Sequence, residues 1–157
     1  MSNTLLSSYG EYDAAIDLML SLAEHHLDIF DPDLSLLKFN RPARHAALKR
    51  LLSSPQGQLR IVVQNSQAVL AQQPLLIRLL ETYGHHFTLL EANESLRHLS
   101  DAFMVADHAH ALVRFHRDQA RSKMLESEED EVEPYQRRFA AIIEEGGTPI
   151  SPRLAGL

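Results

Sequence analysis

Polar side chains follow two apolar runs of the sequence, at the points where strands would end. Asp31 and Asp33 come directly after the run Leu27–Phe30, and Asn65 closes the run that begins at Leu59. Ligands of open α/β sheets bind beyond the carboxyl ends of the strands, so these three side chains are candidates for a ligand site. The same residue types favour turns and helix caps, and that structural role is the alternative for all three.

Nine histidines could supply metal ligands or acid and base groups. His108 and His110 would share one side of an extended segment, and Asp107 or His116 could then complete a metal site. A tight turn at these positions would not preserve that geometry. We therefore expect no metal site and no cofactor.

A cluster of basic residues lies within one short stretch of an acidic chain. The formal net charge is -6, yet no acid interrupts the set Lys38, Arg41, Arg44, Lys49 and Arg50. A helix that exposes this basic cluster could bind the phosphates of nucleic acid or an acidic partner. Because acidic segments lie on both sides of the cluster in the sequence, we favour a solvated helix face over nucleic-acid binding.

Composition points to one ordinary globular domain. The 157 residues are 45 % hydrophobic and 23 % charged, which is close to the average for folded proteins. The sequence contains no cysteine, which excludes disulfides, thiolate metal sites and cysteine nucleophiles and makes the cytoplasm the expected location. No apolar stretch approaches the roughly 20 residues of a membrane span, so no membrane association is expected.

Hydrophobic periodicity and turn residues predict the elements that would position these groups. Ser8 and Glu11 have the spacing of a capping box, which predicts a helix over 9–25. Asn40 as N-cap and Pro42 in the first turn predict a second helix, which would carry the basic cluster. The other predicted elements are strands at 27–30, 59–65 and 87–90, a helix at 74–83, a hairpin of 102–107 and 111–115, an acidic surface loop at 117–131, and a helix from Pro134 to Gly146.

This order of elements predicts the fold class. Helices and strands alternate in the first half of the chain, whereas the short link at His108–His110 favours an antiparallel hairpin over a crossover connection. We expect an α/β fold, a three-layer α/β/α sandwich with a mixed sheet. Residues 1–147 would form the domain, and residues 148–157 would form a flexible C-terminal tail.

Four segments resemble the phospholipase D-like domains of bacteria, and more narrowly a group of short proteobacterial domains of this type. These segments are Leu27–Leu34, Arg60–Asn65, Ser100–Asp107 and Arg138–Ile143. The resemblance extends over roughly residues 9 to 146. It implies that the chain corresponds to one half of a phospholipase D fold.

The same resemblance implies that the catalytic signature has degenerated. Active members carry His-x-Lys-x-x-x-x-Asp, and if Asp107 takes the aspartate position, Ser100 and Ala102 replace the histidine and the lysine. The Gly-Ser-x-Asn that commonly follows corresponds here to Arg114–Arg117. Alanine cannot place a positive charge beside a phosphoryl group, so hydrolysis by the family mechanism is not expected. Ser100 and Asp107 remain candidates for binding a ligand.

We therefore expect a non-catalytic binding or regulatory module whose ligand the sequence does not identify. Because the family assembles one active site from two halves, the resemblance also implies a homodimer, or a protein partner that carries an intact half. A divergent phosphodiesterase or transferase that uses the histidines near 98–116 is one alternative. A nucleic-acid-associated protein that uses the basic helix at 38–50 is the other.

Overall fold

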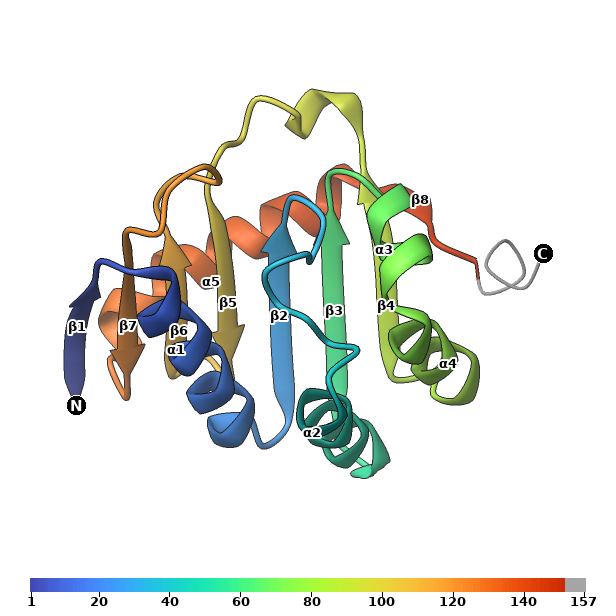
Figure 1. Ribbon diagram of the computed structural model, residues 1–157, viewed down its shortest axis with the longest axis horizontal. Coiled ribbons are helices and arrows are strands. Elements are labelled where there is room, and N and C mark those ends of the chain that lie inside the picture. Colours follow the sequence, from blue (N-terminus) through green and yellow to red (C-terminus); the bar gives the residue numbers. More distant parts are fainter. Residues whose placement is uncertain (152–157) are drawn as a thin grey trace.

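The computed structural model describes residues 1–151, which form an eight-stranded sheet with helices on both faces (Figure 1). In chain order the elements are β1 (Ser2–Leu6), α1 (Tyr9–Leu22), β2 (His26–Asp31), α2 (Pro42–Ser53), β3 (Gln58–Val63), α3 (Gln67–Gln72), α4 (Pro74–Thr82), β4 (Phe87–Ala92), the 3-10 turn η1 (Glu94–Leu96), β5 (Ala102–Ala106), β6 (His110–Arg114), β7 (Ser122–Glu126), α5 (Glu129–Glu145) and β8 (Gly147–Pro149).

The sheet is mixed, as the short hairpin link predicted. Its strand order is β1-β7-β6-β5-β2-β3-β4-β8. Strands β2, β3 and β4 run parallel, whereas every other neighbouring pair runs antiparallel. Since β5 runs against β2, the start of β5 and the end of β6 lie at the same edge of the sheet as the carboxyl ends of β2, β3 and β4. We call this the carboxyl edge.

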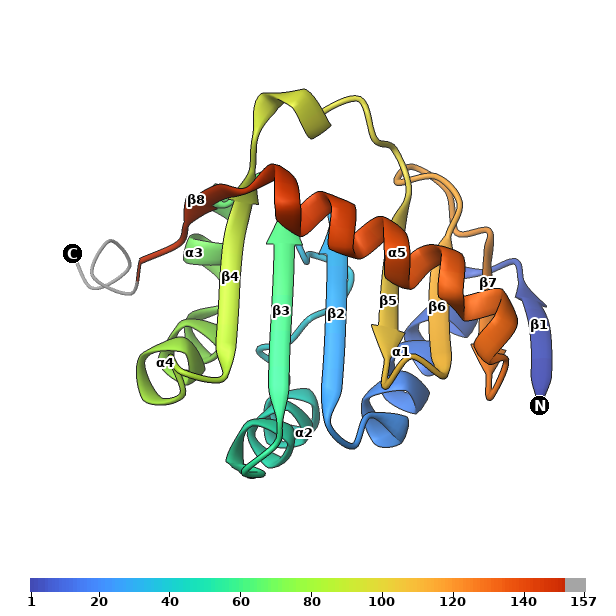
Figure 2. The same ribbon diagram turned by 180° about the vertical axis from the view of Figure 1, so that it is seen from behind.

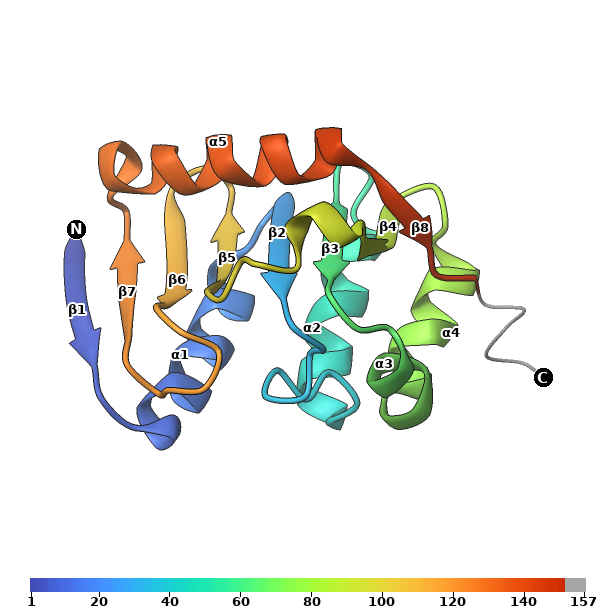
Figure 3. The same ribbon diagram turned by 90° about the horizontal axis from the view of Figure 1, so that it is seen from above.

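Two hydrophobic cores fill the space between the three layers. Helix α5 alone crosses one face of the sheet, while α1, α2, α3 and α4 cover the other (Figures 2 and 3). The larger core packs α1, α2 and α4 against residues such as Ile29 and Ile61, and the smaller core packs α5 against residues such as Phe30 and Val62. Adjacent residues of one strand thus pack into opposite cores, because successive side chains of a strand point to opposite faces of the sheet. The α/β/α sandwich is confirmed.

The ends of two helices show how local sequence signals act. Ser8 and Glu11 form the predicted capping box, in which the Glu11 backbone N–H donates to Ser8 Oγ at 3.1 Å. Helix α5 begins at Glu129, five residues before Pro134, because three acids in its first turn favour the positive end of the helix dipole. Pro134 therefore lies inside this helix, and the prediction of a start at Pro134 was wrong.

Several elements were missed, and the acidic loop predicted at 117–131 was wrong. That segment contains β7, whose Ser122, Met124 and Leu125 are buried between β6 and β1. Strand β1 and helix α3 were also not predicted. Thr148 and Pro149, expected to begin the flexible tail of residues 148–157, instead pair with β4 as part of β8 (Gly147–Pro149), while residues 152–157 lie outside the described residues.

Within residues 1–151, no helix combines the length and the apolar composition that crossing a membrane requires.

Candidate functional site

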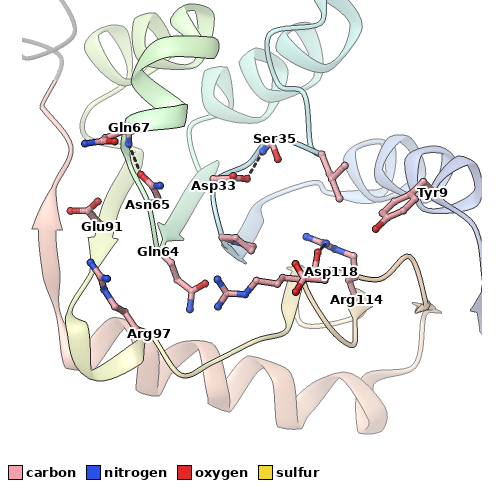
Figure 4. A pocket seen from close by; sticks show the side chains of 13 residues that line it. Tyr9, Asp33, Ser35, Gln64, Asn65, Gln67, Glu91, Arg97, Arg114 and Asp118 are labelled. Carbon is pink, nitrogen blue, oxygen red and sulfur yellow. Dashed lines mark hydrogen bonds between the residues drawn. The ribbon is translucent and has the colours of Figure 1, made fainter.

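A cleft opens at the carboxyl edge of the sheet, where β2, β3 and β4 end (Figure 4). Its volume is about 1020 Å³. The residues that line it come from both halves of the chain: Tyr9, Pro32, Asp33, Ser35, Leu36, Gln64, Asn65, Gln67, Glu91, Arg97, Arg114, Arg117 and Asp118. Three arginines and three carboxylates therefore face one space, which we call the carboxyl-edge cleft.

Arg114, the last residue of β6, is the most deeply buried charged group in the lining, with 2 % of its surface exposed. Its Nη2 lies 3.4 Å from Asp31 Oδ1, its Nη1 donates to the Arg117 carbonyl oxygen, and its guanidinium lies 5.4 Å from the centre of the Tyr12 ring. Its Nε has no hydrogen-bond partner among the described residues. A buried guanidinium at a cleft thus retains one free donor.

Asp31 balances part of this buried charge. Burial raises the pKa of its carboxyl group, while Arg114 and the backbone N–H groups of Leu34 and Asp33 act in the opposite direction. The second carboxylate oxygen accepts the Leu34 N–H at 2.7 Å and the Asp33 N–H at 3.2 Å. Asp31 therefore closes the turn after β2 and also holds Arg114.

The turns after β2 and β3 use the predicted polar residues in local contacts. Asp33 Oδ1 accepts the Ser35 N–H at 3.0 Å, and Asn65 Oδ1 accepts the Gln67 N–H at 3.0 Å. Both residues line the cleft, and their hydrogen bonds are those of turn residues. The ligand-site interpretation and the turn interpretation therefore apply to the same side chains, and a role in ligand binding stays a prediction.

Gln64 ties the cleft to the loop that precedes β5. Its Nε2 donates to the carbonyl oxygens of Leu96 and Leu99, at 3.1 and 2.8 Å. Its Oε1 is buried and accepts no hydrogen bond within residues 1–151. Two residues in the lining of the cleft, Gln64 and Arg114, thus each hold a buried polar atom that has no hydrogen-bond partner within residues 1–151.

Ser100 and Ala102, to which the phospholipase D resemblance assigns the positions of the catalytic histidine and lysine, lie at this same edge. The carbonyl oxygen of Ser100 accepts the Arg117 N–H at 2.6 Å, and Arg117 Nη2 donates to the Leu99 carbonyl oxygen at 2.6 Å. Ala102 is the register partner of Arg114. The segment Arg114–Arg117, which the resemblance aligns with Gly-Ser-x-Asn, therefore lies directly beside Ser100 and Ala102.

Asp107 lies at the opposite edge of the sheet and does not join the other candidates. It occupies the β5–β6 turn with a positive φ of 53°, and its carboxylate accepts the N–H groups of Glu24, His25 and His26 at 2.7 to 2.9 Å. Burial would raise the pKa of Asp107, but these three donors hold it below its ordinary value. Its contacts fix the entry into β2, which is a structural role.

The predicted basic cluster is wrong at one position: Lys38, Arg41, Lys49 and Arg50 are exposed, whereas Arg44 does not lie on the exposed face of α2. Arg44 is 1 % exposed. Its guanidinium donates to Asp17 Oδ1, to Asp13 Oδ1, and to the carbonyl oxygens of Asp13 and Leu37, at 2.8 to 2.9 Å. Arg44 thus joins α2 to α1 instead of facing solvent.

The other members of the cluster are dispersed. Arg41 pairs with Asp13 at 3.2 Å, and Arg50 donates to the Leu20 carbonyl oxygen at 2.9 Å. Lys38 and Lys49 are exposed, and Lys38 lies in the loop before α2. Arg41, not Asn40, is the N-cap of α2, while Asn40 Oδ1 accepts the Leu75 N–H at the start of α4. Asn40 therefore accepts a hydrogen bond at the start of α4, whereas it was predicted to be the N-cap of α2.

The histidines near residues 98–116 lie at different edges. His108 and His110 flank the turn at the Asp107 edge, where His110 Nδ1 accepts the Ser127 N–H at 2.9 Å. His116 follows β6 and its Nδ1 accepts the Asp118 N–H at 3.1 Å. In the described part of the chain, no three metal-binding side chains come together in a group that could hold an ion.

Sequence reasoning missed most of the charged lining of the cleft. It did not single out Arg97 or Glu91, and it treated Arg114 and Arg117 only as departures from a family motif. One signal was present in the sequence: an arginine that ends a buried strand carries a charge that must find a partner or a ligand.

A match to the family described as "Domain of unknown function (DUF7931)" covers residues 9–150. No curated protein matches the sequence.

Solved structures with similar folds include TrmBL2, an archaeal chromatin protein whose structure is described as showing a novel mode of DNA binding. It superposes with a TM-score of 0.70 at 10 % identity over 96 % of this chain, which spans only 54 % of that chain. Nuc from Salmonella typhimurium, a phospholipase D family member, has a TM-score of 0.59 at 12 % identity over 96 % of this chain and 99 % of that one. NucT from Helicobacter pylori has a TM-score of 0.59 at 12 % identity, over 95 % of this chain and 99 % of that one. At these identities the likeness shows the fold.

Proposed function

The chain belongs to this DUF7931 family, and from that premise we propose that it is a non-catalytic binding module that holds a small phosphate-bearing ligand in the carboxyl-edge cleft. The fold is similar to that of phospholipase D family members, and the charged lining of the cleft supports a role in ligand binding. The absence of cysteine favours action in the cytoplasm.

The observation that carries the proposal is the buried guanidinium of Arg114 with its free Nε. Buried donors are nearly always hydrogen-bonded, and an arginine presents planar donors that match the oxygens of a phosphate. Arg117 and Arg97 add two more guanidinium groups to the same lining. A phosphate that accepts from Arg114 would therefore find further donors within the cleft.

Two of the three carboxylates in the lining of the cleft accept local hydrogen bonds, which fix their positions and leave their negative charge in place. Glu91 Oε1 accepts both the N–H and the Oγ–H of Ser66 at 2.9 Å, and Asp33 accepts the Ser35 N–H. The unpaired acceptor of Gln64 favours a ligand that also has a hydrogen-bond donor. A small phosphate ester with a hydroxyl or amino group satisfies both requirements.

Ser100 and Ala102 support binding without turnover. Ala102 offers no charge to a phosphoryl oxygen, and a serine attacks phosphorus only with a positioned base beside it. The described contacts of Ser100 are made by its carbonyl oxygen to Arg117. Of the histidines on which the divergent-enzyme alternative rests, His108 and His110 lie at the other edge, whereas His98 and His116 adjoin the cleft residues Arg97 and Arg117 without lining the cleft themselves.

Nucleic-acid binding is the second candidate, because a DNA-binding chromatin protein shares the fold. The burial of Arg44 and the pairing of Arg41 weaken the basic face on which that hypothesis rested. The mixture of arginines and carboxylates in the cleft also suits a small ligand better than a polyanion, whose binding depends on many phosphate contacts. We therefore favour the small ligand.

Isothermal titration calorimetry with inorganic phosphate tests the proposal. We expect saturable binding to the wild-type chain that Arg117→Gln weakens about tenfold, the equivalent of one charge-assisted hydrogen bond. Arg78→Gln, at an exposed arginine on α4, is the matched control and should bind as the wild type does.

Four results would overturn the proposal. Phosphate could fail to bind, or it could bind Arg117→Gln as tightly as the wild type. Steady turnover of bis(p-nitrophenyl) phosphate that a His116→Ala substitution abolishes would establish the enzyme instead. Tight, salt-sensitive binding of duplex DNA without phosphate binding would favour the nucleic-acid hypothesis.

A further inference from the structure

Strand β1 leaves one edge of the sheet unpaired. Within residues 1–151 it pairs only with β7, from Ser2 opposite Glu126 to Leu6 opposite Ser122. The backbone N–H and C=O groups on its other side therefore face away from the sheet. Figure 1 shows β1 as the outermost strand on this side of the sheet. Such an edge is a template for another strand.

The two edges of the sheet differ in how they are protected. Strand β8 has only three residues and ends at Pro149, and both features discourage further pairing. Strand β1 has five residues with no charge, no proline and no glycine. It also exposes Leu5, with 67 % of its surface accessible. Folded proteins rarely leave an uncharged edge of this kind without an occupant.

We propose that the occupant is a second copy of this chain, whose β1 pairs antiparallel with the first across a two-fold axis at Thr4. In that register Ser2 lies opposite Leu6 of the other copy, and Asn3 lies opposite its Leu5. A two-fold interface must be self-complementary, and an uncharged strand meets this condition because no like charges are brought together.

Charges beside β1 complement each other across the axis. Leu5 is the register partner of Lys123, and Asn3 Nδ2 donates to Glu131 at 2.8 Å. Leu5, Asn3 and Lys123 face the α5 side, where Lys123 Nζ lies 5.2 Å from the centre of the Tyr135 ring. Pairing of Leu5 with Asn3 of the other copy therefore brings the Lys123 of one copy towards the Glu131 of the other.

The geometry of this dimer keeps the two clefts apart. When edge strands pair antiparallel, the two-fold axis is perpendicular to the sheet, so the carboxyl edges of the two copies point in opposite directions. Each carboxyl-edge cleft is then completed by one chain. This differs from the dimer that the phospholipase D resemblance implies, in which two halves share one site, and it does not depend on the proposed ligand.

Sedimentation equilibrium between about 1 and about 500 µM protein tests the dimer, because so short a pairing makes a small interface that associates weakly. Thr4 is exposed, and its substitution by a charged residue places like charges opposite each other at the axis. We expect Thr4→Lys and Thr4→Asp each to raise the dissociation constant about tenfold, the equivalent of 1.4 kcal/mol. An equimolar mixture of the two variants should recover association.

Leu18→Lys is the matched control, because it places the same charge at an exposed leucine on α1. It should dimerise as the wild type does, and the circular dichroism spectra of all variants should be superimposable. A wild type that stays monomeric to the highest concentration would overturn the proposal. So would Thr4→Lys that dimerises normally, or a mixture of the two Thr4 variants that does not recover association.

Discussion

Arg44→Met is the substitution that separates a structural arginine from a binding arginine most clearly. The methionine retains much of the apolar stem of Arg44 but removes its four hydrogen bonds. Leaving the buried Leu37 carbonyl oxygen without a donor costs about 1–3 kcal/mol. Asp13 and Asp17 are partly exposed and regain water, so each of their lost contacts adds only about 0.5–1 kcal/mol.

These contributions sum to a loss of about 3 kcal/mol, a large fraction of the roughly 5–15 kcal/mol that stabilises a domain. For a chain of this length, this corresponds to a fall in melting temperature of about 6–12 °C. The assay is urea unfolding followed by circular dichroism, with Lys49→Met on the exposed side of α2 as the control.

We expect the Lys49 control to remain within about 0.5 kcal/mol of the wild type, as is usual for surface positions. If Arg44→Met were equally neutral, Arg44 would not join α1 to α2 in solution. The basic cluster would then be available for an external partner, and the assignment of Arg44 as structural would fail.

Three further substitutions test other buried contacts. Asp107→Asn should lower the free energy of unfolding by about 1–2 kcal/mol at pH 7. Because the pKa of Asp107 is lowered in the folded protein, its carboxylate stabilises the fold above the ordinary aspartate pKa of about 4. Urea titrations at a series of pH values should show this stabilisation fading as the pH falls below that value. Asp28→Asn should cost about 3 kcal/mol, because it disrupts the two-bond contact with Arg60 beneath α5; wild-type stability of this variant would contradict the assignment. Asp31→Asn removes the internal partner of Arg114, so added phosphate should raise its melting temperature more than that of the wild type, and an equal or smaller rise would argue against phosphate contact with Arg114.

The sequence predicted the central part of the fold because its apolar residues recur with clear periods. Strands β2 and β3 are buried on both faces and form nearly continuous apolar runs, interrupted by Asp28 and Arg60. The β5–β6 hairpin follows from the shortness of its link. Strand β1 escaped prediction because most of its residues are exposed, so no alternation marks it. Strand β7 was obscured by the polar residues around Met124 and Leu125.

The candidate site could be predicted only in its location. Asp33 and Asn65 follow the carboxyl ends of β2 and β3, and both line the cleft. Their location could be predicted because it depends only on the direction of the two strands. The presence of Arg114 in the lining of the cleft depends on the pairing of β6 with β5 and of β5 with β2, which sequence spacing does not reveal. Asp107 illustrates the converse, since a motif position identified it but the register of the hairpin places it at the opposite edge.

The Arg114 Nε–H resonance tests the central claim most directly. Heteronuclear NMR of arginine side chains can follow this group while inorganic phosphate is added, with Arg78 as the internal reference. We predict a saturable shift of the Arg114 resonance, with the same dissociation constant as calorimetry, and no shift at Arg78. An Arg114 resonance that stays unchanged while phosphate binds would contradict the account.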